Sequence, residues 1–152
     1  MRSKILIQWL MAIAWLYLLG VGTETHAQDN PAVQRLRETR DCVGCNLSNT
    51  NLANAYLHQA NLTNANLSNV NLGNADLSGA YLSNANLRNA NLRGANLSGT
   101  NLRNADLRGT DLRDTKLNDA TEIDSKWRIV WEIANQPVSN RDLRKADLEG
   151  AN

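Results

Sequence analysis

Cys42 and Cys45 are the side chains of this sequence best suited to chemistry, because they form a Cys-x-x-Cys motif. Such a pair forms a disulfide, binds zinc, attaches haem or exchanges thiols, depending on its context. Haem attachment needs a histidine where Asn46 stands, zinc needs further Cys or His ligands, and a thioredoxin-like site needs a βαβ context. None of these sets is complete. The motif therefore indicates a structural role, as a local disulfide or as buried thiols, with redox activity as the alternative.

The other candidate side chains are polar. His58 has no nucleophile and orienting group to complete a set, so we expect a solvated surface histidine and no catalytic residue, cofactor or metal ion. Five arginines recur at multiples of five residues and could recognise an acidic partner or anionic lipid: Arg88, Arg93, Arg103, Arg108 and Arg113. Four aspartates lie among them, so a locally neutralised, solvated face is the competing interpretation: Asp106, Asp111, Asp114 and Asp119.

The element that must position these residues is a repeat of five. Leu occurs 23 times and Asn 22 times in 152 residues, and Phe is absent. Fifteen leucines stand at every fifth position and are predicted to form the core: Leu47, Leu52, Leu57, Leu62, Leu67, Leu72, Leu77, Leu82, Leu87, Leu92, Leu97, Leu102, Leu107, Leu112 and Leu117. Two residues before each Leu the side chain is small, as at Cys45. One residue before, it is Asn nine times and Asp three times, with Tyr56, Tyr81 and Lys116 as exceptions.

This period excludes straight elements. Five helical steps place successive leucines about 140° apart, and in a strand an odd period sends alternate leucines to opposite faces. The chain must therefore turn once per repeat. The small residue and the Leu share one face and point inward, while the next two positions, rich in Asn, Gly and Ser, suit turns and positive φ. Stacked coils of this kind form a solenoid.

The repeat resembles the pentapeptide-repeat family, whose motif A(D/N)LXX appears as Ala65-Asn66-Leu67-Ser68-Asn69 and Ala75-Asp76-Leu77-Ser78-Gly79. The resemblance implies an all-β solenoid, a right-handed quadrilateral β-helix with about twenty residues per coil and no general catalytic activity. With the leading Cys-Val-Gly-Cys-Asn-Leu, the chain is similar to exported members of the family from cyanobacteria.

Short capping α-helices are expected at both ends of the solenoid, because an open end exposes apolar side chains and unpaired backbone. Residues 31–40 offer Val33, Leu36 and Ala32 to the first coil. Residues 124–136 form a clearer amphipathic helix, with Asp124 or Ser125 at its start. Its apolar stripe is predicted to plug the solenoid, with partner docking as the alternative: Trp127, Val130, Trp131 and Ala134. Just before it, 121–123 resembles a repeat displaced by one residue, which a bulge would explain.

The N-terminus is typical of an export signal, because Arg2 and Lys4 precede the apolar run 5–19. Cleavage is expected after Ala27. An uncleaved membrane anchor is the alternative. The chain thus divides into a signal peptide at 1–27, an N-terminal cap segment with the Cys-x-x-Cys motif at 28–45, the β-helix at 46–123, a helix at 124–136 that is a cap or an insertion, and residual repeats at 137–152. We expect the periplasm or the thylakoid lumen, where a disulfide persists.

The net charge limits the classes of partner that the chain is expected to bind. The whole chain carries +1, and removing 1–27 leaves 14 basic and 14 acidic residues. A neutral chain is not expected to bind nucleic acid. The leading hypothesis is an exported, non-enzymatic scaffold that associates with a protein and meets a membrane only through its signal peptide. The alternatives are a DNA-mimicking topoisomerase-binding protein, which would need an acidic surface and cytoplasmic residence, and a redox protein using Cys42 and Cys45.

Overall fold

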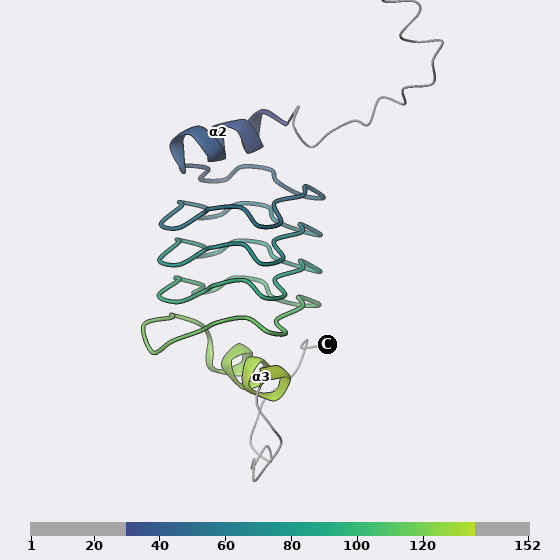
Figure 1. The fold of residues 1–152 in the computed structure, drawn as a ribbon, viewed down its shortest axis with the longest axis vertical. Helices are drawn as coiled ribbons and strands as arrows, with labels where there is room; N and C mark the ends of the chain where they lie inside the picture. Colours follow the sequence, from purple (N-terminus) through teal and green to yellow (C-terminus); the bar gives the residue numbers. More distant parts are fainter. Residues whose placement is uncertain (1–29, 136–152) are drawn as a thin grey trace, which may run out of the picture.

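The computed structural model describes residues 30–135 of the chain. Helix α2 (Pro31–Thr39) lies at one end of a stack of coils, and helix α3 (Ser125–Asn135) lies at the other (Figure 1). The expected signal peptide at 1–27 and the residual repeats at 137–152 lie outside the described residues. Within 30–135, neither helix is long and apolar enough to span a bilayer.

The coils are joined by parallel β-bridges rather than by extended strands. Thirteen isolated bridges connect the coils of the described part, and twelve of them join residues twenty apart, such as Asn46 with Asn66. A period of twenty contains four repeats of five, so each coil has four sides. Each side contributes one bridged residue because the chain turns again two residues later. The structure is thus a four-sided β-helix, as expected, although its bridges are too short to count as strands.

The turns explain the preference for Asn and Gly. Each spans four residues and closes through a backbone hydrogen bond, as from the Thr50 N–H to the Leu47 carbonyl. The third turn residue has positive φ in all fifteen turns from Gly44 to Asp114. Asn and Gly tolerate this left-handed conformation best. The turn positions inferred from the sequence are therefore confirmed.

Gly94→Ala should destabilise the protein more than Gly44→Ala. Both glycines have positive φ, 71° and 64°, so each alanine incurs about 1 kcal/mol of backbone strain. A Cβ on Gly94 would also collide with Oδ1 of Asn74, whereas a Cβ on Gly44 would meet no heavy atom within 4 Å. Thermal unfolding of both variants would measure the difference, and equal losses would show that the Asn74 side chain turns aside at no cost.

The leucine column fills the interior. Fourteen of the fifteen predicted core leucines, from Leu47 to Leu112, are at most 3% exposed. Leu117 departs from the expectation, because it is only partly buried. The last bridge joins Asn101 with Glu122, twenty-one residues apart, so one extra residue bulges out just after Leu117. The bulge inferred from the sequence is confirmed, and it widens the coil there.

Both helices lie within one residue of their expected bounds, at 31–39 instead of 31–40 and at 125–135 instead of 124–136. Asn30 caps α2 by accepting a hydrogen bond from the Ala32 N–H at 2.9 Å, and Val33 and Leu36 are buried. In α3, Trp127 is buried, while Val130 and Trp131 are partly buried against the core. Ala134 was expected on the same face, but it is exposed.

Candidate functional site

Cys42 and Cys45 form a disulfide with a Cα–Cα distance of 5.2 Å. Of the two states left open by the sequence, the structure therefore has the local disulfide. Cys42 stands five residues before Leu47 and occupies the leucine position of one earlier repeat, where it is fully buried. Cys45 occupies the small inward position. Counting back five from Leu47 would have revealed this role for Cys42.

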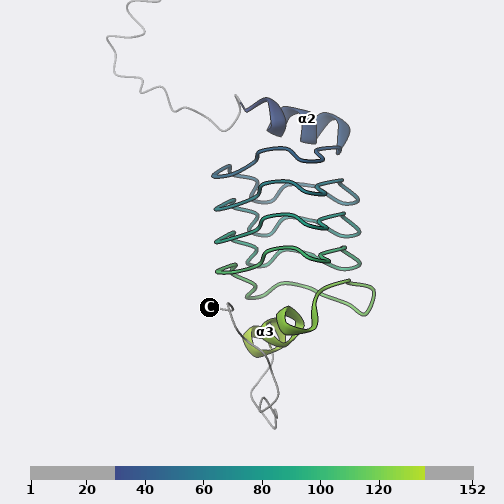
Figure 2. The ribbon, with the colours of Figure 1, turned by 180° about the vertical axis from the view of Figure 1, so that it is seen from behind.

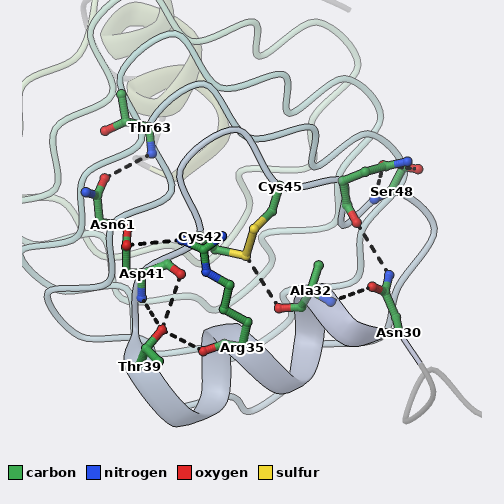
Figure 3. The surroundings of a disulfide bond; sticks show 11 residues. Asn30, Ala32, Arg35, Thr39, Asp41, Cys42, Cys45, Ser48, Asn61 and Thr63 are labelled. Atoms are coloured by element: carbon green, nitrogen blue, oxygen red, sulfur yellow. Dashed lines mark hydrogen bonds and ion pairs between the residues drawn. A yellow bond between two sulfur atoms is a disulfide. The ribbon is translucent and has the colours of Figure 1, made fainter.

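Helix α2 covers the disulfide (Figure 3). Sγ of Cys42 lies 3.4 Å from the Ala32 carbonyl oxygen. A disulfide sulfur has no hydrogen to donate, so this is a packing contact. Beside it, Arg35 forms an ion pair of 3.2 Å with Asp41. Thiol exchange requires a thiolate to reach a sulfur atom, and burial under α2 hinders that approach at Cys42.

His58 lies away from the disulfide, on the outer surface of the first coil. Its Nε2 is 2.9 Å from Nη1 of Arg40. Because a guanidinium only donates, Nε2 is the acceptor in this contact. Among the residues that the structure describes, no group of three His, Cys, Asp or Glu side chains could hold a metal ion.

The five arginines lie where the repeat places them, and each meets a carboxylate. Arg108 contacts Asp106 and Arg113 contacts Asp111 with two hydrogen bonds each. The other three pairs are Arg88 with Asp106 at 3.9 Å, Arg93 with Asp114 at 2.9 Å and Arg103 with Glu122 at 3.3 Å. This geometry supports a locally neutralised face rather than a free basic strip.

Hydrogen bonds from these arginines stabilise the ionised aspartates. The Arg108 side chain, more than any other contact, lowers the pKa of Asp106, and the Arg113 side chain does the same for the pKa of Asp111. Since the folded pKa lies below the unfolded value, the pairs add stability at neutral pH. That stability is lost as the pH falls from about 5 through the folded pKa.

Asp111→Asn should therefore lower stability at pH 7 by less than about 1 kcal/mol, because the pair is at the surface. Asn91 occupies the equivalent position one coil earlier, so an amide fits the site. As the pH falls through the lowered pKa of Asp111, the wild-type carboxylate becomes protonated, and the difference should shrink. Melting temperatures at pH 7 and pH 2.5 would check this, and a difference independent of pH would refute the role of the charge.

A structural reason for the asparagines was missed from the sequence. Among residues 30–135, all twelve Asn and Asp side chains directly before a leucine accept a hydrogen bond from the backbone N–H two residues later, at 3.0 to 3.3 Å. Such Asx turns set up the corner. Several amides also donate to the preceding coil, as from Asn66 to Asn46 at 3.2 Å. The sides of the tube are thus largely saturated by their own bonds.

Tyr56 and Tyr81 stand directly before a leucine, where most repeats have Asn or Asp. They are 83% and 53% exposed, more than any other large hydrophobic side chain among residues 30–135. They are twenty-five residues apart, which is one coil of twenty residues and one side of five. Tyr81 therefore lies one coil further along the tube, on the neighbouring side. Because each breaks the Asx rule and gains no burial, these tyrosines are the surface features that the fold itself does not explain.

The comparisons with known proteins agree with the geometry. The family of pentapeptide repeats matches residues 41–79 and 80–119 in eight copies. The solved structure of HetL, a pentapeptide-repeat protein involved in heterocyst differentiation regulation from the cyanobacterium Nostoc sp. strain PCC 7120, is 43% identical with a TM-score of 0.50. That match covers 50% of this chain and 35% of HetL, so the chain spans about a third of its length. No curated protein matches.

Two further solved structures come from cyanobacteria. The pentapeptide-repeat protein alr5209 from Nostoc PCC 7120 is 31% identical over 76% of this chain and 89% of its own, with a TM-score of 0.42. Rfr23 from Cyanothece 51142 is 26% identical over 62% of this chain and 98% of its own, with a TM-score of 0.44.

Proposed function

The chain belongs to the pentapeptide-repeat family, and from this premise we propose that it is an exported, non-enzymatic scaffold that binds a protein along the sides of its β-helix. One observation carries the proposal: Tyr56 and Tyr81 project into solvent from sides whose other groups are mostly bonded to one another. Exposed tyrosines are enriched in protein interfaces because a rigid ring buries much area at little entropic cost.

The paired arginines take a secondary place in this proposal. An ion pair in solvent already satisfies Arg108 and Arg113, so a partner would have to displace Asp106 or Asp111 to bind them. The five paired arginines would therefore bind an acidic partner more weakly than five unpaired arginines would. We place specificity mainly on the two tyrosines.

Affinity capture tests the scaffold proposal. The bait is the mature chain in the periplasmic or lumenal fraction, compared with the double variant Tyr56→Asn/Tyr81→Asn. Asn is the usual residue at both positions, so the variant should fold at least as well as the wild type. We expect a captured protein to be lost with the double variant and kept with Arg88→Ser/Arg108→Ser. Equal capture by all baits would contradict the role of the tyrosines.

The alternatives are separable by assay. The burial of Cys42 argues against a redox protein. Turnover in an insulin-reduction assay would support the redox hypothesis instead. A DNA mimic needs an acidic surface, which the neutral mature chain lacks. Inhibition of a purified topoisomerase by the mature chain would support the DNA-mimic hypothesis instead.

Export is supported by the N-terminal pattern and by the disulfide, which persists outside a reducing cytoplasm. The chain should then be recovered from the periplasm or thylakoid lumen beginning at Gln28. Mass spectrometry of the intact protein would measure this, and a full-length mass would favour the uncleaved anchor.

We further propose that α2 and α3 act as caps. Helix α3 supplies hydrogen-bond donors to carbonyl groups of the last coil: Trp131 Nε1 to Thr115 at 3.2 Å, Asn135 Nδ2 to Leu112 at 2.9 Å and Arg128 Nη2 to Thr121 at 2.7 Å. At the other end, Val33 and Leu36 of α2 cover the first coil. Buried apolar area and satisfied carbonyls are what an open solenoid end needs.

A further inference from the structure

The last coil has backbone donors that α3 does not satisfy. In the coil above, the Leu87 and Asn89 N–H groups donate to the carbonyls of Asp106 and Arg108, at 2.9 and 3.0 Å. The equivalent groups of the last coil find no acceptor among residues 30–135: these are the N–H groups of Leu107, Gly109, Leu112 and Asp114. They lie on two adjacent sides, so half of the terminal coil is an open β edge. Such an edge is a template for another chain segment.

Two grooves follow this edge, between the coil and α3. The first, of about 320 Å³, lies between Gly109 and Leu112 of the coil and Val130 and Ala134 of the helix. The second, of about 300 Å³, lies between 104–108 and Trp127. Figure 2 shows α3 beneath the last coil, from behind. The other two sides are occupied, because Trp131 binds the Thr115 carbonyl and Arg128 binds the Thr121 carbonyl. A segment that pairs with the coil must therefore use 104–114.

We propose that residues 142–149 of the same chain pair in parallel with this edge and complete half a coil. This segment returns to the repeat, as Asp142-Leu143 and Ala146-Asp147-Leu148. Its two leucines are five residues apart, like Leu107 and Leu112. The register that continues the ladder places Leu143 on Leu107 and Leu148 on Leu112. The carbonyls of 142 and 147 then accept from the Leu107 and Leu112 N–H groups, and Ala146 stacks on Thr110.

The connection is long enough for this register. Nδ2 of Asn135 lies 2.9 Å from the Leu112 carbonyl, so α3 ends beneath that side. From Asn135 to Asp142 there are seven residues, which reach up to about 25 Å when extended. Asp106 is six residues before Leu112 in a coil that turns a corner between them, so it lies within about 22 Å of it. The segment can therefore return to the start of the open edge.

Charge is complementary in the same register. Arg88 reaches across one coil to Asp106, eighteen residues later, at 3.9 Å. By the same geometry Arg108 would reach Asp142 below it, and Arg113 would reach Asp147. Each edge arginine would then sit between two carboxylates, one on its own coil and one on the added segment. Arg144 would stack below Arg108, as Arg108 stacks below Arg88 in the described coils. This favours the intramolecular segment over an unrelated apolar partner at the edge.

Disulfide trapping in the full chain tests the register. Thr110→Cys/Ala146→Cys places thiols at stacked inward positions, about 4.8 Å apart between paired backbones, which suits a disulfide. Cys45 already occupies such a position, so cysteine fits there. Peptide mass spectrometry should find the 110–146 bond within one chain. The matched control, Thr115→Cys/Ala146→Cys, is one repeat out of register and should not form a bond. No 110–146 bond, a bond in the control alone or a bond between two copies would overturn the proposal.

Hydrogen exchange keeps the proposal testable if a cysteine variant fails to fold. In the full chain, the amides of Leu107 and Leu112 should exchange at least about tenfold more slowly than in Leu143→Asp/Leu148→Asp. The Leu87 amide, which donates within the described coils, should be unchanged and serves as the control. Equal exchange at Leu107 and Leu112 in both proteins would overturn the pairing.

Discussion

Replacing Leu82 by Asp should prevent the chain from folding. Leu82 is 0% exposed and sits in the middle of the leucine column. The substitution removes about 1.5 to 3 kcal/mol of apolar burial and leaves a carboxylate unpaired in the interior, at a cost of several kcal/mol. Their sum approaches the whole stability of a domain of this size, about 5 to 15 kcal/mol. Circular dichroism should show no β signal and no cooperative melting transition.

Ser83→Asp is the matched control, one residue further along the same repeat. Ser83 lies at an outer turn position, where a carboxylate stays in water. Its melting temperature should lie within about 3 °C of the wild type. Similar melting of the two variants would contradict the assignment of inward and outward positions on which the fold rests.

Trp127→Ala should cause the second largest loss. Trp127 is 4% exposed and packs against the last coil. Truncating a buried Trp costs about 3 to 5 kcal/mol, which corresponds to a fall in melting temperature of about 6 to 20 °C for a chain of this length. Thermal unfolding by circular dichroism would measure it.

Ile133→Ala, on the same helix, is the control for that experiment. Ile133 is 38% exposed, so its truncation should cost less than about 1 kcal/mol. If α3 served only as a docking surface, neither substitution would affect the stability of the isolated protein. A large loss for Trp127 alone would support the plug, and small losses for both would support docking instead.

The repeat carried most of the fold prediction. Side chains that recur every five residues must share one environment, so the inward leucines, the turns and the bulge before Glu122 could all be inferred without coordinates. Leu117 was the exception. A bulge follows it directly, and no further coil of the described residues lies beneath it to complete its burial. Ala134 was misplaced for a similar reason: helical spacing defines a face, but the angle at which α3 crosses the coil decides how much of that face is covered.

The candidate surface residues were harder to interpret. The arginines were found by spacing. Arg108 and Arg113 pair with the aspartates two residues earlier in their own repeats. The other three pair with carboxylates of the next coil, such as Arg93 with Asp114 twenty-one residues later, and those pairs depend on contacts between coils. Tyr56 and Tyr81 were visible as exceptions to the Asn pattern. Their meaning became apparent only when the neighbouring amides were seen to bind the backbone of their own turns.

By itself, the sequence determined the period, the inward column and the positions of the turns, since these follow from local backbone geometry and from the burial of apolar side chains. Only the tertiary structure decided the four-sided register, because that depends on which residues twenty apart form bridges. It also decided the state of Cys42 and Cys45 and the pairing of the arginines. The pairs of Arg88, Arg93 and Arg103 form only once the coils are stacked. The disulfide and the pairs of Arg108 and Arg113 form within one turn, and they depend on the side-chain conformations that the folded turn adopts.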